Sequence, residues 1–130
     1  MKTRLSTLLF FPILLSQMIL LGCASLEEDA TANWSAEELY TNAKGRLDDK
    51  FYEQSVQLYK SLDLRYPYGL FAEQGKIDIA YAYWRMDDNT SALIACDRFI
   101  REHPDHKNLD YIMYLKALVF FNDDKGLFGM

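Results

Sequence analysis

The sequence contains few of the residues from which catalytic and metal sites are usually built. Among its 130 residues are two cysteines, two histidines and six glycines. It has no glycine-rich phosphate loop, no nucleophile elbow and no dinucleotide-binding fingerprint. We therefore expect a protein without enzymatic activity, without catalytic residues and without a bound cofactor.

The two histidines form an H-x-x-H motif at His103 and His106, which in principle could ligate a metal ion. Pro104 lies between them, and the sequence places no obvious third ligand. Because a metal site needs several ligands at fixed geometry, this motif does not predict one. A metal-dependent hydrolase is consequently the least favoured function.

Positive charge is also scarce, since 14 lysines and arginines stand against 19 acidic residues and the net charge is −5. Loss of the first 22 residues, which include Lys2 and Arg4, would change the net charge to 12 − 19 = −7. An acidic surface argues against nucleic acid and anionic lipid headgroups as general partners.

The first 22 residues predict an export signal. Lys2 and Arg4 give it a positive start, and a mostly apolar segment follows. The segment from Leu20 to Cys23 (LLGC) resembles the bacterial lipobox, in which the cysteine after the cleavage site receives a lipid. The alternative is an uncleaved transmembrane helix, for which the apolar segment is slightly short.

By this resemblance Cys23 carries the lipid, and residues 23–34 form a flexible tether before the folded domain. Ala24 follows the cysteine, whereas the common signal for retention in the inner membrane is aspartate at that place. We therefore expect a lipid anchor in the outer membrane of a Gram-negative bacterium, with the protein on the periplasmic face.

A pattern of six positions recurs 37 residues later in the chain. The first copy contains Ala43, Tyr52, Ser55, Tyr59, Leu62 and Pro67, and the second contains Ala80, Asn89, Ala92, Cys96, Phe99 and Pro104. One more step of 37 residues leads to Ala117. A repeat of this length predicts stacked helical hairpins, so we expect an all-α solenoid of about two and a half hairpins.

The boundaries of these hairpins follow from local signals. Ser35 and Glu38 have the spacing of a capping box, and Pro67 and Pro104 follow predicted helix ends. We expect helices at residues 35–48, 52–65, 70–86, 90–102 and 109–122, the last capped by Asn108. The folded domain at 35–130 would then contain repeats at 35–69, 70–107 and 108–130, and the third repeat would be incomplete.

Pairs of aspartates recur at Asp48-Asp49, Asp87-Asp88 and Asp123-Asp124. Paired carboxylates can perform acid–base chemistry. Because these pairs fall at the same point of each repeat, we interpret them as residues of the turns between helices. Cys96 takes the repeat position of Tyr59, on an inward face, and is predicted to be a buried thiol without a disulfide partner.

The repeat resembles a tetratricopeptide repeat. The small, aromatic, small and proline positions of that family match Ala43, Tyr52, Ser55 and Pro67 in the first copy, and Ala80, Tyr83, Ala92 and Pro104 in the second. The period of 37 exceeds the usual 34 residues, so the loops are expected to be longer.

A closer resemblance rests on the strings RYPYG at 65–69, DRFIR at 97–101 and the segment from His103 to Leu118. These strings are similar to the BamD (YfiO) family of outer-membrane assembly lipoproteins, and the lipobox fits the same family. The resemblance covers almost all of the chain. The family carries further repeats, which implies that this sequence is a fragment or comes from a truncated gene.

Membership of this family would imply a role in the Bam complex, which folds and inserts β-barrel proteins. The resemblance implies BamA, BamC and BamE as partners, largely through later repeats. It also implies that the early repeats recognise the C-terminal targeting segment of unfolded outer-membrane barrel proteins. The alternative is another periplasmic repeat lipoprotein that acts as an adaptor for cell-wall or division enzymes.

In the repeat architecture, the first helix of each hairpin lines a groove. The groove-facing positions are rich in aromatic and cationic residues, which suit an extended apolar peptide that ends in a carboxylate. The predicted peptide-binding residues are Tyr40, Lys44, Tyr81, Trp84, Arg85, Tyr114 and Phe121. Any of these rings could instead belong to the core, where we place Tyr59, Leu62, Tyr83, Phe99 and Ile100.

Overall fold

The computed structural model describes residues 29–128, and their side chains as far as Phe121. The chain divides into two compact units, residues 1–32 and 33–130. The second unit contains the helices α2 (Ala36–Asp48), α3 (Tyr52–Arg65), α4 (Leu70–Arg85), α5 (Asn89–Glu102) and α6 (Leu109–Phe128). Residues 29–128 contain no strand, so the all-α prediction is confirmed. The predicted export signal and Cys23 lie outside the described residues.

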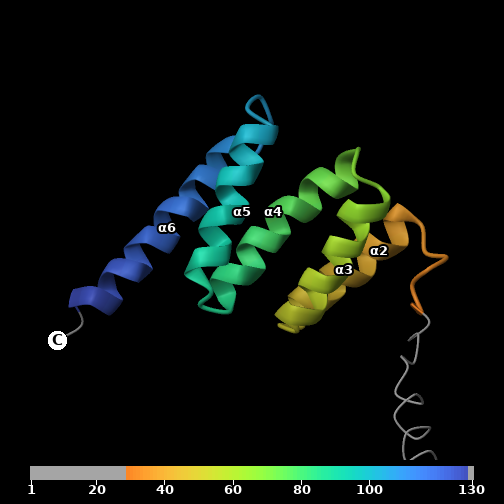
Figure 1. Ribbon diagram of the computed structural model, residues 1–130, viewed down its shortest axis with the longest axis horizontal. Coiled ribbons are helices and arrows are strands. Elements are labelled where there is room, and N and C mark those ends of the chain that lie inside the picture. The colour runs from red at the N-terminus through yellow and green to blue at the C-terminus, as the bar shows by residue number, and fades with distance from the viewer. Residues whose placement is uncertain (1–28, 129–130) are drawn as a thin grey trace, which may run out of the picture. The chain divides into compact units, whose positions relative to one another are not determined.

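Successive helices of the second unit lie side by side and run antiparallel (Figure 1). Each helix contacts the next one along the chain, and α2 also contacts α4, as α4 does α6. The backbones of α3 and α5 do not approach each other in this way, and these two helices meet through the ion pair between Asp63 and Arg98. The hairpins therefore converge on the side formed by α2, α4 and α6, which we call the inner face. This arrangement is the predicted solenoid of stacked hairpins.

The capping box at the start of α2 forms as predicted. The backbone N–H of Glu38 donates to Ser35 Oγ over 3.2 Å, and Glu38 Oε2 accepts from the backbone N–H of Ser35 over 2.8 Å. These bonds satisfy two backbone donors that the first helical turn leaves free.

The backbone conformation that follows the first helix of each hairpin repeats with the 37-residue period of the sequence. Residue Lys50 after α2 has φ = 67°, and Asp87, 37 positions later and after α4, has φ = 59°. Gly69, before α4, has φ = 107°, a conformation that L side chains rarely adopt. The predicted bounds of α2 to α5 agree with the structure to within one residue. The turns at Asp48-Asp49 and Asp87-Asp88 are likewise confirmed.

The end of the last helix was predicted wrongly. The sequence indicated an end at Asn122 and a turn at Asp123-Asp124, but α6 continues to Phe128. This segment contains no proline, and aspartate and glycine lower helix propensity by about 1 kcal/mol or less. Because an existing helix adds one hydrogen bond for each further residue, it extends through such residues. At the start of α6, the Asn108 carbonyl accepts from the Ile112 N–H over 3.2 Å.

The repeated small residues form the contact between paired helices. Ala43, Ser55, Ala80 and Ala92 are all fully buried. The Ser55 hydroxyl donates to the Ala43 carbonyl over 2.8 Å, so this buried hydroxyl is satisfied. Ala117, at the next repeat position, is exposed because no described helix follows α6 to cover that face.

Larger apolar residues pack around these contacts in two clusters. The first cluster consists of Leu39, Ala43, Leu47, Val56, Tyr59, Leu62 and Ala82, and the second of Ile77, Ala80, Cys96, Phe99, Ile112 and Leu115. The predicted core positions of Tyr59, Leu62 and Phe99 are confirmed, whereas Tyr83 and Ile100 are partly buried against the clusters. Burial also raises the pKa of the Cys96 thiol to about 11, as expected for an unreactive thiol.

Two helical glycines provide a test of this packing. A Cβ added at Gly45 would meet nothing within 4 Å, whereas one at Gly75 would lie 3.0 Å from Cδ1 of Tyr59. The Tyr59 ring cannot yield, because it is buried and its hydroxyl donates to Asp78. We expect Gly45→Ala to raise the free energy of unfolding by about 0.5–1 kcal/mol, and Gly75→Ala to lower it by about 1 kcal/mol.

Urea unfolding followed by circular dichroism measures both changes. Because the two substitutions share the same gain in helix propensity, the difference between them reports the contact with Tyr59. Equal stabilisation by both alanines would contradict the packing described here.

Candidate functional site

A cavity of about 280 Å³ opens on the inner face. Side chains from α2, α4 and α6, from the turn after α2 and from the first residue of α3 surround it. They are Lys44, Leu47, Asp48, Lys50, Tyr52, Asp78, Tyr81, Arg85 and Tyr111. Three of the predicted peptide-binding residues, Lys44, Tyr81 and Arg85, therefore lie together in this cavity.

Arg85 has the most distinctive environment of the cavity residues. Its guanidinium lies over the rings of Tyr52 and Tyr81, 5.4 and 5.7 Å from their centroids. Its Nη1 donates to the Tyr81 hydroxyl over 2.7 Å. None of the ion pairs among the described side chains includes Arg85. The tyrosines thus hold the guanidinium in place, and it remains available to an anionic ligand.

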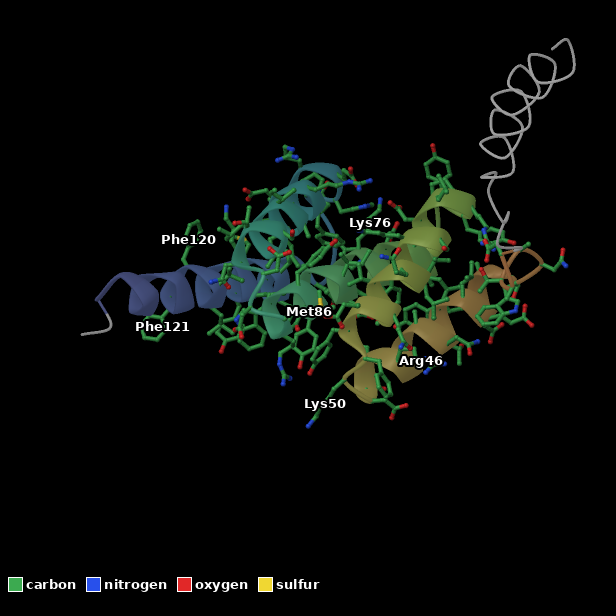
Figure 2. The ribbon with its side chains drawn as sticks, turned by 60° about the horizontal axis from the view of Figure 1, so that its bottom comes forward. Arg46, Lys50, Lys76, Met86, Phe120 and Phe121 are labelled. Carbon is green, nitrogen blue, oxygen red and sulfur yellow. The ribbon has the colours of Figure 1, made fainter. Side chains whose placement is uncertain are left out.

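The two lysines of the cavity differ in their partners. Lys44 forms an ion pair with Asp48, with Nζ 2.9 Å from Oδ1, and both side chains are well exposed. Lys50 is exposed in the turn between α2 and α3 and extends away from the helices (Figure 2). Since a surface ion pair is worth about 0–1 kcal/mol, Lys44 can exchange Asp48 for a ligand at little cost.

Asp78 forms the buried part of the cavity wall, and sequence reasoning missed it. Its Oδ2 accepts from the Tyr59 hydroxyl over 2.8 Å, and its Oδ1 accepts from Gln74 Nε2 over 3.1 Å. Gln74 Oε1 in turn accepts from Asn108 Nδ2 over 3.3 Å, so the hydrogen bonds join α3, α4 and the start of α6. Burial raises the pKa of Asp78 despite these donors. The available signal was a carboxylate within the apolar run from Ile77 to Ala80.

The other predicted residues lie elsewhere in the second unit. Tyr40 is half-buried, with its ring centroid 5.8 Å from that of Tyr59 and 5.3 Å from that of Phe71. Phe71 is exposed and was not predicted. Tyr114 and Phe121 are 61% and 59% exposed on α6. Figure 2 shows Phe121 on the same side of the helices as Lys50, and Phe120 on the opposite side.

Trp84 does not line the cavity. Its ring packs against the second core cluster and lies 5.8 Å, between centroids, from that of Tyr81. Its Nε1 is buried and has no hydrogen-bond partner. Leaving such a donor unpaired costs about 1–3 kcal/mol, and most buried donors in folded proteins are paired.

A second cavity, of about 220 Å³, lies on the other side of α4 from the inner face, between α3 and α5. Two of its three cations are paired with carboxylates, whereas Lys60 Nζ lies 5.6 Å from the centroid of the Tyr83 ring. Lys76 Nζ is 2.9 Å from Glu102 and 3.6 Å from Asp63, and Arg98 is 2.8 Å from Glu102 and 3.3 Å from Asp63. An anionic ligand that binds Lys76 or Arg98 would have to displace this network, whereas Arg85 of the inner face has no such ion pair with a described side chain to give up.

The two histidines are packed rather than poised for metal binding. The ring centroid of Phe99 lies 5.0 Å from that of His103 and 5.1 Å from that of His106. Nδ1 of His106 accepts from the backbone N–H of Asn108 over 3.0 Å. Within the described part of the chain, no three acidic, histidine or cysteine side chains are grouped as metal ligands would be.

Comparison with known proteins gives both a family model and close relatives. A tetratricopeptide repeat family model matches residues 27–130. The chain is 42% identical over 105 residues to the outer membrane protein assembly factor BamD of Neisseria meningitidis serogroup B, covering 81% of this chain and 39% of that protein. It is 31% identical over 113 residues to BamD of Vibrio cholerae, covering 87% and 46% of the two proteins.

A third relative, BamD of Xylella fastidiosa, is 32% identical over 124 residues, which cover 94% of this chain and 42% of that protein. The chain thus spans less than half the length of each of these relatives. Among its described residues, no helix is both long and apolar enough to span a membrane.

The ion network of the second cavity should make stability depend on pH. The hydrogen bond from Arg98, together with Lys76, lowers the pKa of Glu102 to about 2 from its ordinary 4.5. Since the folded pKa is the lower one, this carboxylate stabilises the fold above pH 4.5 and loses that effect as pH falls towards 2. We expect Glu102→Gln to reduce stability at pH 7 and to flatten its decline across this window.

Urea unfolding at a series of pH values between 2 and 7 measures this effect. Glu53→Gln, at an exposed position of α3, controls for the loss of one surface carboxylate. An unchanged slope between pH 4.5 and 2 in Glu102→Gln would show that the network does not couple to folding.

Proposed function

Because the chain belongs to the tetratricopeptide repeat family and is related to BamD assembly factors, we propose that it is a binding scaffold for outer-membrane protein assembly. In this proposal the inner face binds the targeting segments of unfolded outer-membrane β-barrel proteins. The chain performs no catalysis and holds the segment for folding and insertion by other components.

The observation that carries the proposal is the environment of Arg85. Its guanidinium lies against two tyrosine rings and has no carboxylate partner among the described side chains. Such a group can bind a peptide carboxylate with two parallel hydrogen bonds. Aromatic side chains and arginine dominate the energetics of many binding interfaces. The C-terminal carboxylate of a targeting segment is the ligand group that this arrangement fits.

The remaining aromatic residues extend the site on both sides of this anchor. Tyr111 lines the cavity, and Tyr114 follows it by one helical turn on the same face of α6. Tyr40 and Phe71 form a ring pair between α2 and α4. In an extended peptide, side chains that point to the same side recur every second residue, about 7 Å apart. Separate aromatic contacts along the inner face suit such a ligand.

The relatives' names and the amino-terminal sequence suggest where this scaffold works. The relatives are outer membrane protein assembly factors, and we propose that this chain joins the Bam complex through BamA and other Bam components. We also propose that Cys23 is lipidated and holds the protein at the periplasmic face of the outer membrane. A lipid with several acyl chains is a firm anchor, since each buried methylene contributes about 0.8 kcal/mol.

Removing Arg85 should weaken peptide binding. The probe is a ten-residue peptide of alternating apolar and polar residues, prepared with either a free carboxylate or an amide at its C-terminus. We expect Arg85→Ala to reduce affinity for the carboxylate peptide about tenfold, since a charge-assisted bidentate contact is lost. Isothermal titration calorimetry measures this change.

Two controls isolate the contact. Arg101→Ala removes an exposed arginine of α5 that lines neither cavity and should leave affinity unchanged. Arg85→Ala should have no effect on the amide peptide, because the amide lacks the charge that Arg85 would bind. Equal losses for both peptides would remove Arg85 from the role of carboxylate ligand.

The two cysteines offer a matched test of the anchor. In cells supplied with radiolabelled palmitate, we expect Cys23→Ala to abolish labelling and to release the protein from the membrane fraction. Cys96→Ala, which changes a buried thiol, should remain labelled. Palmitate incorporated into the Cys23→Ala protein would refute lipidation at this residue.

A further inference from the structure

The indole N–H of Trp84 is the feature of the inner face that the peptide site leaves unexplained. The ring is partly buried, but its Nε1 is fully covered and has no acceptor. An indole nitrogen donates a hydrogen bond but cannot accept one, so only an acceptor group can pair with it. A phenylalanine would fill an apolar position without this cost. The N–H therefore does not stabilise the fold of the free chain.

Trp84 lies where a ligand on the inner face could reach it after a small movement. Trp84 and Arg85 are one helical turn from Tyr81 on α4, so the three side chains share one side of that helix. The Trp84 and Tyr81 rings are in contact. The second core cluster, on which Trp84 packs, includes Ile112 and Leu115 of α6. Since α6 packs mainly on α5 and touches α4 more lightly, the boundary between α4 and α6 is the place that can open.

A main-chain carbonyl is the acceptor that an extended peptide offers at every residue. A peptide anchored by its carboxylate at Arg85 would bring its last carbonyls next to the neighbouring side chain of α4. Binding a main-chain group fixes the peptide backbone without selecting its side chains. Such a contact suits a scaffold that must accept many different targeting segments.

We propose that Trp84 determines the affinity of this site for the main chain of an extended peptide. When a peptide binds, the indole turns from the boundary between α4 and α6 and donates to a peptide main-chain carbonyl. The donor is unpaired in the free chain and paired in the complex, so the indole gives up no hydrogen bond of its own when it binds the peptide carbonyl. The inference rests on the proposed peptide-binding function and deepens it.

The sharpest test replaces the N–H without changing the ring. In Trp84→benzothienylalanine a sulfur takes the place of the indole nitrogen, so the shape is kept and the donor is lost. We expect this variant to be at least as stable as the parent chain but to bind the carboxylate peptide about fivefold to tenfold more weakly. A purely structural role for the ring would leave peptide affinity unchanged.

Nuclear magnetic resonance provides an independent measurement on the unaltered protein. The sequence contains two tryptophans, so the spectrum has two indole N–H signals, and Trp84→Phe assigns the one from Trp84. We expect peptide addition to move the Trp84 signal downfield as the hydrogen bond forms. The Trp34 signal should stay in place, because Trp34 packs on the first core cluster.

The outcomes separate this inference from the proposal on which it rests. If the parent chain and the benzothienylalanine variant bind the peptide equally, or if the Trp84 signal does not move, the role of Trp84 is refuted while peptide binding stands. A bound water that satisfies the indole in the free chain, seen as a cross-peak with water, would also refute it. If the parent chain does not bind the peptide at all, both proposals fail.

Discussion

The close approach of paired helices at small residues is the constraint on which the rest of the structure depends. Ala43 and Ser55 allow α2 and α3 to meet, and Ala80 and Ala92 do the same for α4 and α5. The Ser55 hydroxyl donates to the Ala43 carbonyl, so the contact buries no unsatisfied group. With the axes this close, the bulky side chains must pack above and below the contact, where they build the two core clusters.

The same packing creates the candidate site. Because α4 packs against both α2 and α6, the side chains of the first helix in each hairpin meet on one face. Tyrosines of α3, α4 and α6 line the cavity there, and the cations on the two sides of α4 differ in their partners. Arg85 is held by tyrosines, whereas Lys76 and Arg98 on the other side of α4 are held by carboxylates. This difference in partners, rather than cavity size, favours the inner face as the place for an anionic ligand.

The sequence predicted the features that depend on neighbours in the chain. Caps, turns and helix ends arise from adjacent residues, and the 37-residue spacing located the buried small residues. The same spacing led to the prediction that Lys44, Tyr81 and Arg85 share one face, and they line one cavity. Features that depend on three-dimensional surroundings were missed. Asp78 accepts hydrogen bonds from Tyr59 and Gln74 in the interior, and no local pattern reveals these partners. Helix α6 continues through an aspartate pair, whereas α2 and α4 end at or just before such pairs.

The helices contact others no further than two elements along the chain, and this has a consequence for how the molecule loses structure. In such an array, stability is approximately a sum of terms for each unit and for its boundary with the next. One hairpin can therefore melt while its neighbour persists, and cooperativity across the array is low. A ligand that spans α2, α4 and α6 would couple these units and make the array unfold as a whole. Ligand binding would then narrow the melting transition as well as raise its midpoint temperature.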